Sequence, residues 1–183
     1  MELRTKRLLL RGWTDEDVEP FARMNDDPTV MKYLKRHVDR AAIEARVNAE
    51  REHFKEHGYG LWVLERLGAA GFIGFCGLIN VGDQLHYAPA VEISWMLHPD
   101  FWGRGYVSEA AVAVIAFGFE NLKLTQIVAN AAVGNANSRR VMERIGMSHD
   151  PKDDFDHPLK AIDDALRRQV LYRLTYDDWQ QKR

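Results

Sequence analysis

The first third of the chain places its apolar residues at helical spacing. In the charged segment from residue 39 to about 57, one apolar stripe is formed by Ile43, Val47 and Phe54. This pattern predicts a helix, and Gly58 is placed to end it. An earlier helix is expected to begin at Thr14, whose hydroxyl suits a cap, and to run to about Asn25. A short strand at residues 8–10 precedes it, and a short helix opens at residues 27–28.

From residue 61 onward, apolar residues occur in short continuous runs, which are typical of strands. Strands are predicted at residues 61–64, 72–79 and 91–97, with a turn at 68–71 between the first two. Strands and helices alternate after Pro99. Helices are expected at 106–122 and 136–145, and strands at 126–133 and 170–174. This order predicts one mixed α/β domain over residues 1–183, built around a central sheet.

Composition narrows the class of protein. The 183 residues are 46% hydrophobic and 28% charged, as in an ordinary soluble domain. With 25 Lys and Arg against 27 Asp and Glu, the net charge of −2 gives no reason to expect a nucleic acid or an anionic membrane as partner. The single cysteine, Cys76, excludes an internal disulfide and a Cys-rich metal site. No segment has the ~18 apolar residues of a membrane span, so a cytoplasmic location is expected.

The segment HPDFWGRGYVSEA, residues 98–110, is the most informative one. A predicted strand ends there, a loop carries Gly103 and Gly105, and a helix begins directly afterwards. Glycines let a ligand approach the backbone closely, and the first N–H groups of a helix have no intrahelical acceptor. Arg104 adds a positive charge. The segment therefore predicts an anion site, with a pyrophosphate as its natural occupant.

Two other interpretations of this turn remain open. It can be a tight strand-to-helix turn without a ligand, or the phosphate loop of a dinucleotide-binding fold. The second requires Gly-x-Gly-x-x-Gly, but position 108 is Ser108. The Walker pattern Gly-Lys-Ser/Thr does not occur in the sequence.

Taken together, three segments resemble the GNAT superfamily of N-acetyltransferases, and within it the RimJ/RimL-type branch, which is ribosomal-protein N-acetyltransferase-like. They are the opening RTKRLLLRGWTDEDVEPFARMNDDPTVMKYL, the segment EISWMLHPDFWGRGYVSEA, and NANSRRVMERIGM. The resemblance covers nearly the whole chain in the right order. The superfamily's pattern Gln/Arg-x-x-Gly-x-Gly/Ala places Trp102 at its first position and Val107 at its last. Tryptophan is usual at the first position in this branch, so only Val107 departs mildly from the pattern.

The resemblance implies a fold and a cosubstrate. The fold is a twisted mixed sheet flanked by helices, with a V-shaped splay between its two central strands. The cosubstrate is acetyl-CoA, without a metal, and the acetyl group passes directly to an amine in a ternary complex. The residues implied to contact acetyl-CoA are Met96, Leu97, His98, Gly103, Arg104, Gly105, Tyr106, Val107, Ser108 and Asn135.

The resemblance implies two candidates for the chemistry. Many members place a Tyr on the last central helix to protonate the departing thiolate, but that position is Met142 here. The branch places Ser138 three residues after Asn135, so Ser138 is expected either to donate to the thiolate or to cap the helix. Glu92 lies where several members keep a glutamate. It is either a base that acts through water or a structural acid.

Other side chains and the acceptor stay open. His53 and His57 have the i, i+4 spacing of metal ligands, but no matching carboxylate accompanies them, which favours a solvated helix face. The acceptor is expected to be a protein or peptide N-terminal amine of low pKa. A small amine, such as an antibiotic, a polyamine or an amino acid, is the alternative, and a non-catalytic acetyl-CoA-binding module is a third hypothesis. A homodimer is kept open.

Overall fold

The computed structural model describes residues 1–34 and 39–182, which form two units. The first unit comprises Met1–Leu78 and Ser94–Val114, and the second comprises Ile79–Ile93 and Ile115–Arg183. Each unit is thus assembled from two separate stretches of the chain. Because the stretches interleave in sequence, this division is not a boundary between consecutive domains, and the expected single domain over 1–183 stays a prediction.

In the first unit, hydrogen-bonded strands follow one another in sequence order. They are β1 (Leu3–Arg4), β2 (Leu8–Arg11), β3 (Leu61–Arg66), β4 (Ala69–Asn80) up to Leu78, and the end of β5 (Val91–Leu97). β4 must approach β5 closely at Gly74, because a Cβ there would collide with the carbonyl oxygen of Met96. Glycine at this position therefore allows β4 to pack directly against the strand that leads into the glycine turn.

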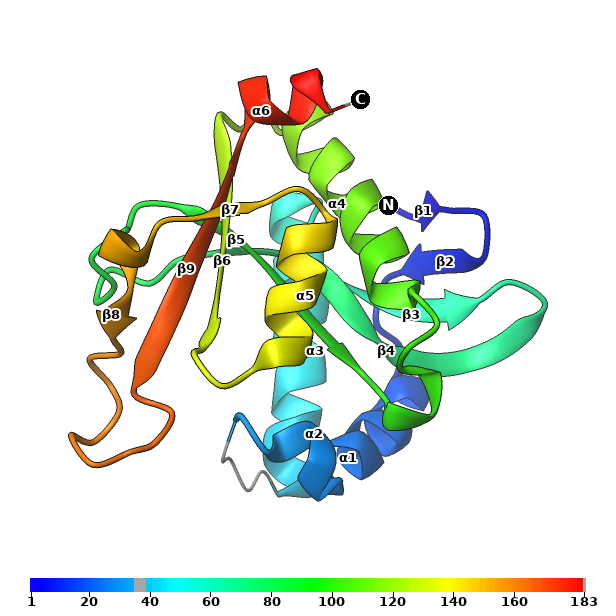
Figure 1. Cartoon of the computed structure of the whole chain (residues 1–183). Coiled ribbons are helices and arrows are strands. Elements are labelled where there is room, and N and C mark those ends of the chain that lie inside the picture. Colours follow the sequence, from blue (N-terminus) through cyan, green and yellow to red (C-terminus); the bar gives the residue numbers. More distant parts are fainter. Residues whose placement is uncertain (35–38, 183) are drawn as a thin grey trace. The chain divides into compact units, whose positions relative to one another are not determined.

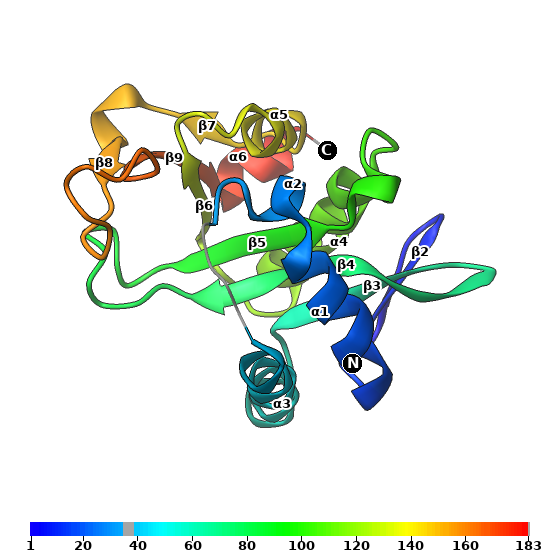
Figure 2. The ribbon, with the colours of Figure 1, turned by 90° about the horizontal axis from the view of Figure 1, so that it is seen from below.

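The helices of the first unit lie where the sequence predicts helices, but the α-helix expected to begin at Thr14 begins only at Val18, after one turn of 3₁₀ helix. They are α1 (Val18–Asp26) behind a 3₁₀ turn at Asp15–Asp17, α2 (Pro28–Met31) and α3 (Arg40–His57). Asp39 caps α3 by accepting a 2.8 Å hydrogen bond from the N–H of Ala42, and Gly58 ends it at φ 73°. α1 packs against α3, which Figure 2 shows nearly end-on. Ile43 and Val47 are buried, as the predicted stripe requires.

The second unit contains the first part of β5, then β6 (Gln126–Ala132), β9 (Arg168–Thr175) and β7 (Ser148–His149), while β8 (Phe155–Asp156) pairs with β9. β6 and β9 form an antiparallel ladder from Gln126–Thr175 to Ala132–Gln169 and lie side by side in Figure 1. β5 and β6 are parallel, with Glu92 registered opposite Val128. This parallel pair among antiparallel ones confirms the mixed α/β class, and the splay beyond it stays a prediction.

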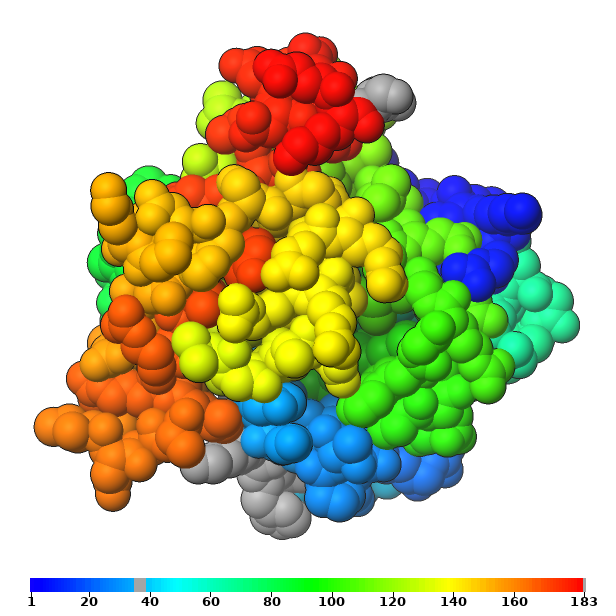
Figure 3. Space-filling view, in the orientation of Figure 1, coloured from blue at the N-terminus to red at the C-terminus, as the bar shows by residue number. Residues whose placement is uncertain are grey.

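Three helices accompany these strands: α4 (Tyr106–Glu120), whose residues are divided between the two units, α5 (Ala136–Arg144) and α6 (Tyr176–Gln181). The space-filling view shows α5 and the connection from β8 to β9 at the surface (Figure 3). No helix in the described part of the chain is long and apolar enough to cross a membrane.

The predicted elements are present, with differences where the pattern is too short to read. The turn between β3 and β4 lies at residues 67–68 rather than 68–71, because β3 runs on to Arg66 and β4 begins at Ala69. β1, β7 and β8 have two residues each, which is too few to show a period, and the sequence did not predict them. The six-residue helix α6 was also missed.

Candidate functional site

The turn that precedes α4 has the backbone of an anion site. Gly103 and Gly105 have φ values of 72° and 76°, in the left-handed region that other residues adopt at a cost. The N–H of Glu109 donates to the carbonyl of Gly105 at 3.0 Å and starts the ladder of α4. The earlier N–H groups of the helix have no acceptor within it. They are therefore available to an oxygen of a bound anion.

The side chains at this turn also fit an anion. Ser108 is in the first turn of α4, and its Oγ is buried without a hydrogen-bond partner among the described residues. A buried hydroxyl without a partner is costly, and an anion oxygen bound at the turn would supply that partner. Arg104 is exposed beside it. Both residues were among the predicted contacts, and the turn fits the pyrophosphate that acetyl-CoA would bring.

The end of β5 has fewer backbone N–H and carbonyl groups available to a ligand than the sequence indicated. The N–H of His98 donates to Ile73 at 2.9 Å, so it is already used by β4. The carbonyl of Met96 also faces β4, at Gly74. Because strand groups alternate between neighbours, the N–H and carbonyl of Leu97 point to the opposite edge, where the carbonyl accepts from the Trp102 indole at 2.7 Å. Leu97 is thus the residue whose N–H best suits a ligand at this edge.

A second region, in the other unit, surrounds Glu92. Its Oε2 accepts a 2.7 Å hydrogen bond from Nδ2 of Asn130 on β6 and a 3.4 Å bond from the hydroxyl of Tyr87. The same Asn130 nitrogen donates to the Tyr87 oxygen at 2.9 Å. Tyr87 is held in place by the buried core around it, where its ring lies 5.4 Å from that of Phe155. These three residues form the Glu92 cluster.

The environment of this cluster changes the acidity of its carboxyl group. Burial raises the pKa of Glu92 to about 7, although hydrogen bonds from Asn130 and Tyr87 act in the opposite direction. Burial, together with the charge of Glu92, also raises the pKa of Tyr87, so its hydroxyl stays protonated near neutral pH. A carboxylate with a pKa near 7 can both take up and release a proton at neutral pH.

Sequence analysis proposed Glu92 but missed its partners. Asn130 is a polar residue in the apolar run QIVANAA of a buried strand, which is a signal that could have singled it out. Tyr87 lies in a segment without a readable motif, and nothing in the sequence marked it.

The start of α5 corrects one expectation. Asn135, not Ser138, is the N-cap: its Oδ1 accepts from the N–H of Ser138 at 3.2 Å. Ser138 is the third residue of the helix, so the alternative that its hydroxyl caps α5 is wrong. Its role at a thiolate stays a prediction.

The remaining candidates are Cys76 and the pair His53 and His57. Cys76 is fully buried, and burial raises the pKa of its thiol well above the ordinary value. The rings of His53 and His57 are 4.5 Å apart, and His53 is half-buried rather than solvated. In the described ranges, no group of three or more His, Cys, Asp or Glu side chains is placed to hold a metal.

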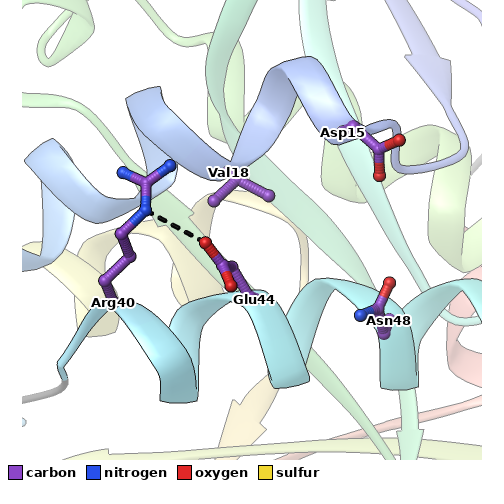
Figure 4. Close-up of a pocket in the computed structure, with 5 residues that line it drawn as sticks. All are labelled: Asp15, Val18, Arg40, Glu44 and Asn48. Atoms are coloured by element: carbon purple, nitrogen blue, oxygen red, sulfur yellow. Dashed lines mark hydrogen bonds and ion pairs between the residues drawn. The ribbon is translucent and has the colours of Figure 1, made fainter.

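A groove of about 310 Å³ lies between the start of α1 and α3 (Figure 4). It is lined by Asp15, Val18, Arg40, Glu44 and Asn48. Its charges are largely paired: Arg40 bonds Glu44 at 3.0 Å, and Asp15 bonds Arg51 at 2.6 Å. The groove therefore offers few free groups for chemistry.

The chain is similar in sequence and in fold to acetyltransferases of one family. Residues 7–148 match the family model of the acetyltransferase (GNAT) domain. Uncharacterized protein YkkB of Bacillus subtilis (strain 168) is 34% identical over 81% of this chain and 86% of its own. The FsC-acetyl coenzyme A-N(2)-transacetylase of Aspergillus fumigatus is 26% identical over 97% of this chain and 77% of its own. The crystal structure of a GNAT-family acetyltransferase from Bacillus anthracis superposes with a TM-score of 0.78 at 26% identity, covering 97% of this chain and 99% of that one.

Proposed function

The chain belongs to the acetyltransferase (GNAT) family, and from this premise we propose that it acetylates the N-terminal α-amine of a protein or peptide, or another amine of similarly low pKa. When bound, acetyl-CoA supplies the acetyl group as a thioester. The glycine turn would hold its pyrophosphate through the N–H groups of residues 103–108 and the Ser108 hydroxyl. The N–H of Leu97 would face the pantetheine or the thioester carbonyl.

The Glu92 cluster is the observation that supports this choice of acceptor. Glu92, with its pKa of about 7, would take the proton of the acceptor amine, directly or through a water molecule. An α-ammonium group has an ordinary pKa of about 8, so the transfer is uphill by about 1.4 kcal/mol. For a lysine side chain at about 10.4, the same transfer is uphill by about 4.6 kcal/mol. Glu92 is thus a much better base for the α-amine.

The thiol chemistry of the chain supports direct transfer. A covalent acetyl-enzyme would require an accessible thiolate or another activated nucleophile. The only cysteine, Cys76, is buried, and its pKa is raised. Transfer from acetyl-CoA to the amine without an enzyme-bound acetyl group is the route that this favours. Asn135 would contact the cofactor, and Ser138 would assist the departing thiolate.

A small-molecule amine is the second candidate acceptor. It is favoured by the Aspergillus relative, whose name describes an N(2)-transacetylase and which aligns with 97% of this chain.

The test is a screen of free-thiol release from acetyl-CoA with peptides of varied N-terminal residues, N-acetylated copies of the same peptides that carry an internal lysine, and small amines. We expect the free α-amines to be the best acceptors. Polyamines or lysine side chains as the best acceptors would contradict the proposed acceptor, and no release with any amine would favour a non-catalytic module.

A further inference from the structure

The carboxylate of Glu109, in the first turn of α4, forms hydrogen bonds with the connection between β1 and β2. Glu109 accepts from the Thr5 hydroxyl at 2.6 Å, from the Arg7 N–H at 2.8 Å and from Arg7 Nε at 2.6 Å. These three residues, which belong to one unit, are called here the Glu109 clamp. Neither Arg7 nor Thr5 was singled out by the sequence, because Arg7 and Glu109 are 102 residues apart.

The clamp reaches the glycine turn itself. Nη1 of Arg7 donates to the carbonyl of Arg104 at 2.9 Å, and the guanidinium lies 4.6 Å from the centre of the Tyr106 ring. Nη2 of Arg7 is 3.6 Å from the point where a Cβ on Gly105 would stand. Arg7 thus contacts the residues on both sides of Gly105, the backbone of Arg104 and the ring of Tyr106, and places a charge beside Gly105.

The negative charge of Glu109 affects anion binding at the start of α4, because Arg7 neutralises it. Glu109 is in the first turn of α4, where the helix end otherwise attracts anions. Although burial opposes it, hydrogen bonds from Thr5 and Arg7 hold the pKa of Glu109 below its ordinary value, so the carboxylate is charged at neutral pH. An unneutralised carboxylate there would repel a bound phosphate. Nε of Arg7 neutralises it, while Nη2 has no hydrogen-bond partner among the described residues and remains available.

We infer that Arg7 is a positioning residue for the pyrophosphate of acetyl-CoA: it holds the carbonyl of Arg104, packs against the ring of Tyr106 and masks the negative charge of Glu109 at the anion site. The inference rests on the proposed cofactor site. Stability alone does not explain such a clamp, because the Arg7 side chain is 42% exposed and exposed ion pairs contribute little to folding.

The experiment measures acetyl-CoA affinity by calorimetry in the full chain, with melting temperatures on the same preparations. Arg7→Gln should raise Kd by about tenfold or more. Glu109→Gln added to it removes the unmasked charge, so the double variant should bind at least about threefold more tightly than Arg7→Gln alone. Arg7→Lys keeps the charge but loses the planar fork, and should fall between wild type and Arg7→Gln.

Arg40 provides a matched control. It lies in the first unit, is 62% exposed and also bonds two carboxylates, that of Glu19 and that of Glu44. Figure 4 shows the bond with Glu44. Arg40→Gln should leave Kd unchanged.

Three results would contradict the role of Arg7 in positioning the pyrophosphate. A folded Arg7→Gln with wild-type Kd, a loss of equal size in Arg40→Gln, or a double variant that binds no better than Arg7→Gln would overturn it. Failure of the wild type to bind acetyl-CoA would instead contradict the proposed function.

Discussion

The glycine turn and the Glu92 cluster differ in the groups they offer and in how much water reaches them. The turn presents backbone N–H groups and exposed cations, and its geometry depends on two glycines with positive φ. The cluster presents one half-buried carboxylate held by two side chains. Exposed charges are screened by salt, whereas a desolvated carboxyl has a shifted pKa. The first region is therefore suited to bind an anion at any pH near neutrality, and the second to move a proton.

The largest effect is expected from Glu92→Gln. The amide cannot accept a proton from the ammonium, so kcat should fall by about 10²-fold or more, with the Kd of acetyl-CoA unchanged. Glu143→Gln is a suitable control, because Glu143 also accepts from a tyrosine hydroxyl, that of Tyr172 at 3.1 Å. Steady-state kinetics and calorimetry on both variants make the comparison. A Glu92→Gln variant with wild-type kcat would leave the cluster without a catalytic role.

Gly105→Val should lower the affinity for acetyl-CoA, which Glu92→Gln leaves unchanged. Valine is strained at a φ of 76° and would place its side chain against the bound anion and Arg7, so acetyl-CoA affinity should fall by at least about tenfold, or ~1.4 kcal/mol. Gly68 is the matched control. It has a φ of 80° in the β3–β4 turn, and a Cβ there would meet nothing within 4 Å. Gly68→Val should cost comparable stability with unchanged affinity, and equal losses of affinity in both would show that only folding is affected.

The smallest expected effects separate Asn135 from Ser138. Asn135→Ala removes the cap of α5 and should lower the free energy of unfolding by about 1 kcal/mol. Ser138→Ala should leave stability near wild type because Ser138 is not the cap. If its hydroxyl assists the thiolate, kcat falls by about tenfold or more with little change in the KM for acetyl-CoA. Urea unfolding and kinetics on one preparation distinguish these effects. A Ser138→Ala variant with wild-type kcat would remove this residue from the mechanism.

The difference between the two regions also explains why the sequence predicted the glycine turn but not the Glu92 cluster. The turn is local: its strand end, glycines and helix start lie within residues 98–110, and each position carries its own conformational signature. The sequence therefore predicted the backbone there, and the pyrophosphate expected at the turn stays a prediction. Asn130 and Glu92 are 38 residues apart and are brought together by the pairing of β5 with β6. Sequence patterns place residues on strands but do not say which polar side chains meet across them.

The same limit applies to Arg7 and to the cap of α5. Arg7 contacts the turn at Arg104, across 97 residues of sequence, and no local pattern encodes such a contact. At α5, both Asn135 and Ser138 suit a cap by residue type, and a shift of the helix start by a few residues exchanges their roles. The helix begins at Ala136, so the cap falls to Asn135.

The central claim is that Glu92 moves the proton, and the pH dependence of kcat/KM tests it most directly. The measurement uses an acceptor whose own amine titrates below about pH 6, so that only groups of the enzyme change charge between about pH 6 and 8. The neutral amine of such an acceptor still loses a proton when its nitrogen attacks the thioester carbonyl, and Glu92 must be deprotonated to take up that proton. The value of kcat/KM for the wild type should therefore rise with pH through an apparent pKa near 7 and then level off. Glu92→Gln should show a low, flat profile over the same range. A rise through pH 7 that persists unchanged in Glu92→Gln would contradict the assignment.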